Sequence, residues 1–467
     1  MTIYDRKWQI FSLVAVSIFM STLDSSIVNV ALPFIMQDMA TDMPTIQWVV
    51  LIYLLTVSSL LLTFGRLSDI KGRRPIYVAG FMVFTLGSFF CATAPSAGFL
   101  VMARVIQGVG ASMLMACSPA LIVDVFEKEQ RGRALGMMGA VVAAGLTLGP
   151  VAGGLILEYA SWRTVFYINI PIGIAATLAG IRMLKTIPGG RGSGEPLDLL
   201  GSLMMIIGLS SLILCLTQVT VWGIFSLKFA GCLLVCCFAG MGFAANAGRS
   251  AHPLFDPGLL RIRLFVLPLA ASALLFAALF IIVFMMPFYL TYPCGFSPAR
   301  TGGVMIVPFL FLLFVSPVSG AMSDRFGSRI LCFSGMLLLG ISLVSLMSVF
   351  PEMETRAILW RVALAGMGTA LFVSPNNTAI MGAVSMNSRG TASGASATAR
   401  NLGMVMGVAL AGTLFTTSFT HLTQGAGLDH YTPAMAPYFM ISFRRVMAAG
   451  ALIAFLGAAI TLARGKG

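Results

Sequence analysis

A polar ten-residue segment at residues 65–74 recurs in looser form at residues 320–329, with the shared pattern Gly-x-x-Ser-Asp-x-x-Gly-x-Arg. Both copies lie between long apolar runs, which predicts a tight polar loop joining two membrane helices in each case. Two more pairs recur in the same order, residues 131–136 with 389–394 and residues 104–110 with 361–368. These recurrences predict two related halves, an organisation typical of transporters.

Composition places the chain in a lipid bilayer. Of its 467 residues, 58% are hydrophobic and 10% are charged, and its mean hydropathy is +0.95, so it lacks the polar surface of a soluble globule. Apolar runs of roughly 18 or more residues, the length that spans a bilayer core, occur about fourteen times. We therefore expect an all-α polytopic membrane protein with about fourteen transmembrane helices.

The net charge of +13 would suggest a nucleic-acid partner in a soluble protein. With both termini cytoplasmic, however, most of the 29 Lys and Arg fall on cytoplasmic loops and ends, as the positive-inside rule requires. We expect no nucleic-acid partner and a multi-pass protein of the cell membrane, most simply a bacterial cytoplasmic membrane. The eight Cys show no paired spacing, so neither a disulfide framework nor a metal site is expected.

The repeats predict three parts: an N-terminal six-helix bundle at residues 1–190, a linker with two additional transmembrane helices at 191–262, and a C-terminal six-helix bundle at 263–467. The two additional spans, near 198–220 and 223–246, follow the Gly- and Pro-rich stretch 188–196. They are expected to form an inserted helical pair between two pseudo-symmetric bundles.

Several motifs resemble the major facilitator superfamily, and the two extra helices resemble its fourteen-helix drug:proton antiporter branch. Residues 65–74 are similar to the loop signature of the superfamily, residues 23–33 to the helix-1 signature of the branch, and residues 162–173 to a further segment of it. Residues 104–110 are similar to the helix-4 proton-coupling motif. A set of glycines and one proline resembles the helix-5 antiporter motif of the branch: Gly145, Gly149, Pro150, Gly153 and Gly154. The resemblance implies export in exchange for protons.

Asp24 is the one acidic residue that we place deep in a predicted span, about 21 Å along its helix. Such carboxylates usually face a cavity and mark proton or ion pathways, although a hydrogen-bonded structural Asp is the alternative. Arg104, about 9 Å into its own span from the external side, lies at a similar level. We expect Asp24 and Arg104 to form a pair that couples protonation to conformation, or else Arg104 to snorkel to the interface.

Four further polar residues are candidates for the substrate cavity: Asn29, Gln107, Asn376 and Arg400. Asn29 and Gln107 can add polar contacts near Asp24. Arg400 lies roughly 13 Å into its predicted helix, where it either faces the cavity or bonds to neighbouring carbonyls.

The repeated loop is expected to act as a conformational switch. The glycines of the first copy permit a tight turn, and Asp69 can accept from the amides at the start of the next helix. Arg73 and Asp124 are expected to form a charge network that clips the bundles together, while the basic residues of this loop also fix topology. The expected set is Gly65, Asp69, Gly72, Arg73, Arg74 and Asp124, with Gly320, Asp324, Gly327 and Arg329 in the second copy.

In the predicted helix 5, the glycines one turn apart permit close backbone approach, and Pro150 favours a kink. Helix packing explains this pattern as well as gating does.

These observations favour a monomeric, proton-coupled exporter of small amphipathic compounds, neutral or monocationic, working by rocking of two bundles. The alternative is export of an anionic or lipid-like compound, since Arg104 and Arg400 outnumber Asp24 within the spans. No catalytic residues are expected, because no nucleophile and base share a span. The expected coupling ion is the proton, with no cofactor and no metal.

Overall fold

The computed structural model describes residues 7–186, 197–223, 225–249, 257–385 and 389–464, and it is helical throughout these ranges apart from short connections. Fourteen helical segments among the described residues are long and apolar enough to cross a membrane, as the sequence predicts. The N-terminal helices are α1 (Lys7–Asp38), α2 (Met43–Lys71), α3 (Arg73–Ala92), α4 (Ala97–Val125), α5 (Lys128–Tyr159), α6 (Thr164–Tyr167) and α7 (Asn169–Met183).

The remaining helices are α8 (Leu199–Trp222), α9 (Leu227–Arg249), α10 (Arg263–Thr291), α11 (Pro298–Met305), α12 (Val307–Phe326), α13 (Ser328–Leu346), α14 (Thr355–Gly382), α15 (Arg389–Leu422) and α16 (Ala436–Ala463). Short 3₁₀ turns lie at Leu184–Thr186, Pro257–Arg261, Leu428–His430 and Pro433–Met435. Two spans are interrupted: α6 and α7 together form one, and α11 and α12 form another.

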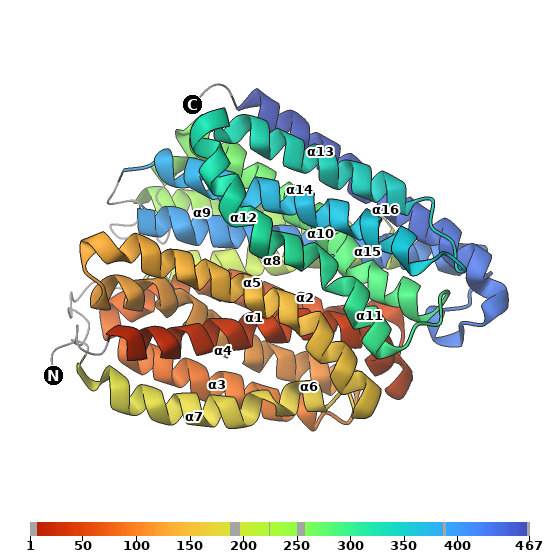
Figure 1. Cartoon of the computed structure of the whole chain (residues 1–467), viewed down its shortest axis with the longest axis horizontal. Helices are drawn as coiled ribbons and strands as arrows, with labels where there is room; N and C mark the ends of the chain where they lie inside the picture. The colour runs from red at the N-terminus through yellow and green to blue at the C-terminus, as the bar shows by residue number, and fades with distance from the viewer. Residues whose placement is uncertain (1–6, 187–196, 224, 250–256, 386–388, 465–467) are drawn as a thin grey trace.

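Helices α1 to α7 pack into one bundle and α10 to α16 into a second, and Figure 1 shows the two side by side. The additional pair α8 and α9 packs outside them, where α8 contacts both α2 and α15. The boundary predicted at 190/191 lies outside the described residues, and α10 begins at Arg263. The face at which α1 begins and α16 ends is called the terminal face below, and the other end is called the opposite face (Figure 1).

The two copies of the loop motif make the same turn. Gly72 has φ +95° between α2 and α3, and Gly327 has φ +78° between α12 and α13. Side chains with a Cβ rarely adopt such angles, so glycine allows one helix to end and the next to begin within a single residue. The repeat in sequence is therefore a repeat in backbone geometry.

The helix-5 glycines serve two contacts. A methyl group placed on Gly149 would lie 2.6 Å from the Ser26 side chain, and Gly145 and Gly153 are likewise crowded by α1. Gly154 instead faces the second bundle, where a methyl group would lie 2.6 Å from the carbonyl oxygen of Pro298. Three glycines therefore pack α5 inside its own bundle, and the fourth brings it against α11.

At the opposite face, α5 and α11 close the gap between the bundles. Gly302 packs on the carbonyl of Pro150, and the Glu158 carboxylate accepts a hydrogen bond of 3.1 Å from the backbone N–H of Ala299, in the first turn of α11. Toward the terminal face, methyl groups placed on the α5 residues Gly132, Gly136 and Gly139 would meet nothing within 4 Å. α5 therefore contacts the second bundle at the opposite face, while the other half of α5 is free of close neighbours at these positions.

Candidate functional site

The Asp24 carboxylate lies in the interior of the N-terminal bundle and is fully enclosed by donors. Arg104 Nη1 is 2.5 Å from Asp24 Oδ2, while Gln107 Nε2 and Asn169 Nδ2 donate to Asp24 Oδ1 at 2.8 and 3.0 Å. The exposed fraction is 0% for Asp24 and 1% for Arg104. The predicted pairing of Asp24 with Arg104 is thus present in this conformation.

Arg104 has acceptors on several sides. Its Nε donates to the carbonyl of Val49 at 3.0 Å, and its Nη1 also donates to Gln107 Oε1 at 2.6 Å. The guanidinium carbon lies 4.0 Å from the ring centroid of Tyr53, in a cation–π geometry. Since the side chain is buried among these groups, the snorkelling alternative does not describe it.

Two glycines allow the helices around this cluster to approach. A methyl group on Gly87 of α3 would lie 2.5 Å from the backbone nitrogen of Gln107, and one on Gly110 would lie 2.3 Å from that of Phe84. The close approach lets Gln107 reach both Asp24 and Ser88, to which its Nε2 donates at 2.9 Å. Gln107, a candidate for the cavity, therefore belongs to the Asp24 cluster.

Sequence analysis did not identify Asn169 as a site residue. Asn169 is the first residue of α7, directly after the break that separates α7 from α6, and it is 1% exposed. The signal was present in the segment 162–173, where a polar residue precedes a proline inside an apolar run. In the same segment Trp162 and Arg163 donate to the Asp38 carboxylate at 2.8 and 2.9 Å, fixing the end of α1.

Arg400 and Asn376 line one narrow hollow in the C-terminal bundle, together with Ser272, Phe276, Phe372, Val373, Asn377 and Ser396. These residues come from α10, α14 and α15. Arg400 lines this hollow and donates to no carbonyl among the described residues, and its place in the substrate cavity stays a prediction. Asn29 lies elsewhere: it is buried on α1, its amide donates to the carbonyl of Ser25 at 2.7 Å, and its Oδ1 has no partner.

The switch-loop residues lie within the N-terminal bundle. Arg73 forms ion pairs with Asp124 of α4 and with Asp69, the latter at 3.6 Å, and it donates to the carbonyl of Ala120 at 2.6 Å. Arg74 donates to the carbonyl of Ile181 on α7 at 3.4 Å. The network thus joins α2, α3 and α4 in this conformation, and a clip across the bundles remains a prediction.

In the second copy of the loop, Arg329 donates to the carbonyl of Leu462, which ties α13 to α16. Gly320 packs near the Ser374 hydroxyl, whereas Gly65 of the first copy has open space around it. The side chain of Asp324 lies outside the described part of the structure.

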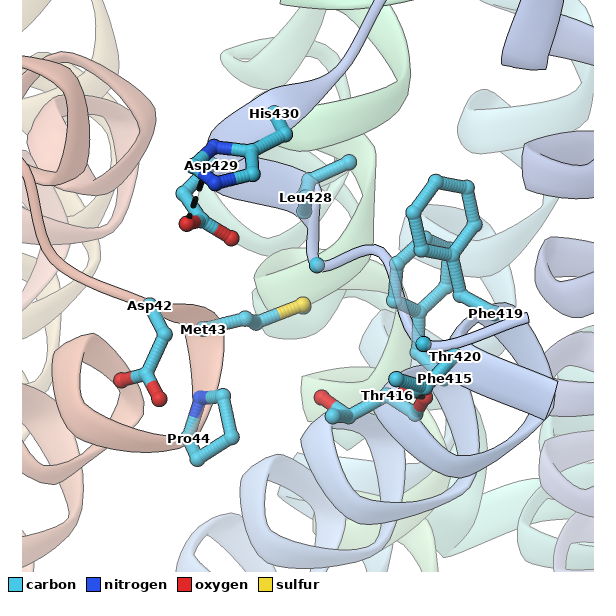
Figure 2. A pocket seen from close by; sticks show the side chains of 12 residues that line it. Asp42, Met43, Pro44, Phe415, Thr416, Phe419, Thr420, Leu428, Asp429 and His430 are labelled. Carbon is cyan, nitrogen blue, oxygen red and sulfur yellow. Dashed lines mark hydrogen bonds and ion pairs between the residues drawn. The ribbon is translucent and has the colours of Figure 1, made fainter. Parts of the chain in front are cut away.

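A larger concavity of about 400 Å³ lies at the opposite face, between the start of α2 and the end of α15. Figure 2 shows Asp42, Met43 and Pro44 on one side and Phe415, Thr416 and Phe419 on the other. Its acidic groups have partners: Asp42 accepts from the backbone N–H of Thr45 at 3.0 Å, and Asp429 pairs with His430 at 3.3 Å. Sequence analysis predicted none of these residues, because they come from both bundles.

Comparison with known proteins agrees with this architecture. The family model of the Major Facilitator Superfamily matches residues 14–408. A solved structure of a bacterial homolog of the human lysosomal transporter Spinster, in an inward-facing and occupied conformation, is similar with a TM-score of 0.72 at 14% identity, covering 99% of this chain and 97% of that chain. At this identity the likeness concerns the fold.

Two relatives are similar over most of their length. The riboflavin transporter RibZ of Clostridioides difficile (strain 630) is 32% identical over 416 residues, covering 89% of this chain and 90% of that protein. The multidrug resistance protein Stp of Mycobacterium tuberculosis (strain ATCC 25618 / H37Rv) is 32% identical over 414 residues, covering 88% of this chain and 76% of that protein.

Proposed function

The chain belongs to the major facilitator superfamily, and from that premise we propose that this membrane transporter exports small amphipathic compounds in exchange for protons. The observation that carries the proposal is the buried Asp24 and Arg104 pair. An ionisable pair inside the bilayer is costly and is usually retained for ion or proton movement. No other acidic residue of the described spans is held in a comparable pair with 0% exposure.

The pair provides a simple coupling step. While Arg104 contacts Asp24, the guanidinium occupies Asp24 Oδ2 and supplies the counterion of the carboxylate. Both helices belong to the N-terminal bundle, so the coupling step is a movement of α4 relative to α1 inside this bundle, which accompanies the rocking of the two bundles and exposes Asp24 to protons. Gln107 and Asn169 hold Asp24 Oδ1 in place, so the change is confined to the oxygen that faces Arg104.

The polarity follows from the basic residues. We assign the terminal face to the cytoplasm because it carries most of the Lys and Arg. On this assignment the structure is closed toward the outside by α5 and α11 and corresponds to an inward-facing state. In the proposed cycle, separation and re-formation of the single Asp24 and Arg104 pair within one monomer are sufficient.

The proposal has two candidates for the charge of the substrate: neutral or monocationic, and anionic. Asp24 as the deep acid favours neutral or monocationic compounds. The relatives named for riboflavin transport and multidrug resistance support neutral and varied amphiphiles. An anionic compound is favoured instead by Arg400, which faces the hollow of the C-terminal bundle while Asp24 is enclosed by its own partners.

The test is transport in proteoliposomes with a pH gradient and a membrane potential imposed separately. Riboflavin serves as the neutral probe, beside a monocation and a monoanion of matched hydrophobicity. Proton-coupled export predicts uphill accumulation of the probe, which collapses when a protonophore is added. The probe should be recovered chemically unchanged. Accumulation that is insensitive to both gradients would overturn the proposal.

A further inference from the structure

Arg400 carries a positive charge that the structure leaves without a partner. Its guanidinium donates no hydrogen bond and joins no ion pair among the described residues, and its carbon lies 6.0 Å from the ring centroid of Phe276. Arg104 and Arg361, two other arginines inside spans, both donate to carbonyl oxygens. The side chain is partly exposed and lines the hollow, so its N–H donors are open to an acceptor that enters there.

The helices around Arg400 hold no acid that could move onto it. The sequences of α10, α14 and α15, which line the hollow, contain no Asp or Glu. Rotamer changes within these helices therefore cannot neutralise the guanidinium. A negatively charged acceptor would therefore have to come from outside these three helices, as a solute or a lipid.

The neighbouring polar groups also present donors. Asn377 Oδ1 already accepts from the Ser396 hydroxyl at 3.2 Å, so the amide nitrogen of Asn377 is left to donate. Asn376 is held across the bundle by its hydrogen bond of 3.1 Å to the carbonyl of Pro268. The Asn377 amide and the Ser272 hydroxyl can therefore donate to a group that enters the hollow, while Phe276 and Phe372 supply an apolar wall.

We propose that this hollow binds the carboxylate, or the planar carbonyl edge, of the transported aromatic compound. The planar guanidinium fork matches two oxygens of one flat group, and the phenyl rings suit an adjoining aromatic ring. The hollow has a volume of about 10 Å³, so it takes only the polar end of the compound. This inference rests on the proposed function, whose substrate class it narrows.

A matched series of probes tests the inference by equilibrium dialysis on the purified full chain, without any gradient. The probes are 2-naphthoate, 2-naphthamide and 2-naphthylmethylammonium, which share one ring system and differ in the polar group. The expected order of affinity is naphthoate, then naphthamide, then the ammonium compound. Binding of the ammonium compound equal to or tighter than that of naphthoate, or no binding of naphthoate, would overturn the proposal.

Variants locate the effect. Arg400→Gln should weaken naphthoate binding about tenfold to a hundredfold, the range expected for charge-assisted hydrogen bonds, and should change naphthamide binding much less. Arg400→Lys should be intermediate, because it keeps the charge and loses the fork. Arg361→Gln is the matched control, since it removes a span arginine whose acceptors are the carbonyls of Ser345 and Ala357. An equal loss of naphthoate affinity in the control would contradict the assignment.

Stability provides an independent readout. Because Arg400 is unpaired, Arg400→Gln should unfold at the same temperature as the unchanged protein, or a higher one, when no probe is present. A marked drop in unfolding temperature would show that the residue has a structural partner and would overturn the proposal.

Nanodiscs distinguish a solute from a lipid headgroup. Naphthoate affinity should be similar in zwitterionic nanodiscs and in nanodiscs containing phosphatidylglycerol. Its loss only in the anionic nanodiscs would assign the hollow to a lipid phosphate and exclude the transported compound. All these binding measurements are made without gradients, so a failure of proton coupling would leave their outcome unchanged. A failure of naphthoate binding would likewise leave the test of proton-coupled transport unchanged.

Discussion

At the scale of single residues, the structure separates two arginines that look alike in sequence. Arg104 is buried and bonded to an acid, an amide and a carbonyl, whereas Arg400 donates no hydrogen bond among the described residues. A buried ion pair contributes little net stability, but breaking it by removing one partner costs about 3–5 kcal/mol because a charge is left uncompensated. The pair is therefore better explained by function than by stability.

Asp24→Asn should abolish uphill, proton-driven export, because the amide keeps the shape of the carboxyl group and cannot release a proton. The same change should lower the free energy of unfolding by about 3–5 kcal/mol, because Arg104 loses its counterion. Proteoliposome transport and chemical denaturation measure the two effects.

The double variant Asp24→Asn with Arg104→Gln separates these roles. Removing the uncompensated cation should recover part of the lost stability and none of the coupling. Uphill transport by either variant would remove Asp24 from the mechanism.

At the scale of elements, backbone contacts through glycine decide which faces of the helices meet. Along α5, Gly145, Gly149 and Gly153 fix α1, and the next residue, Gly154, meets α11 of the other bundle. The same helix therefore carries a permanent contact and a contact that must break when the opposite face opens.

Gly302→Ala should destabilise the closed opposite face, because the added methyl group would lie 2.2 Å from the carbonyl oxygen of Pro150. Overpacking of about 1–3 kcal/mol would shift the balance toward the open state roughly five-fold to a hundred-fold. Electron–electron resonance between spin-labelled residues introduced at positions 159 and 352 would report a longer distance. Gly303→Ala is the control, since a methyl group there meets nothing within 4 Å; an equal shift in both variants would contradict this contact as the cause.

Gly72→Ala should lower stability by about 1–3 kcal/mol, the usual cost of a backbone conformation that residues with a Cβ avoid. Gly65→Ala, seven residues earlier in the interior of α2, should be neutral or stabilising by up to about 1 kcal/mol. Thermal unfolding of both variants checks the pair, and equal losses would show that the turn angle is not the cause.

At the scale of the whole molecule, two bundles meet along α2 and α15, along α1 and α10, and through α5 and α11. The charge network of Arg73 lies inside one bundle, so the motion of one bundle against the other need not break it in this state. Asp24 belongs to one bundle and Arg400 to the other, so the proposed proton group and the proposed substrate group would lie on different moving bodies.

Exchange of one proton for one substrate molecule predicts how export depends on voltage. Each elementary charge moved through 100 mV is worth about 2.3 kcal/mol. A monoanion leaving as a proton enters moves two charges, a neutral compound moves one, a monocation moves none, and a dication moves one charge against the potential. Export driven by a potassium diffusion potential should therefore rank in that order, with dications poor substrates. Efficient dication export at matched hydrophobicity would mean that a second acid takes part.

The sequence by itself determined the membrane environment, the fourteen spans, the paired halves and the glycine turns. Each of these features follows from local composition or from a repeated motif, and both can be recognised from residues that are neighbours in the sequence. The pairing of Asp24 with Arg104 was also predictable, since the rise per residue of a helix sets the depth of each residue in the membrane.

Only the tertiary structure decided which helix faces meet. It brought Asn169 to Asp24 through the break between α6 and α7, and it gathered Arg400, Asn376 and Asn377 in one hollow. In spans that are apolar on every side, hydrophobic periodicity does not indicate an inward face. Rotation about each helix axis is set by packing of small residues against neighbouring helices, and that packing depends on residues far apart in the chain.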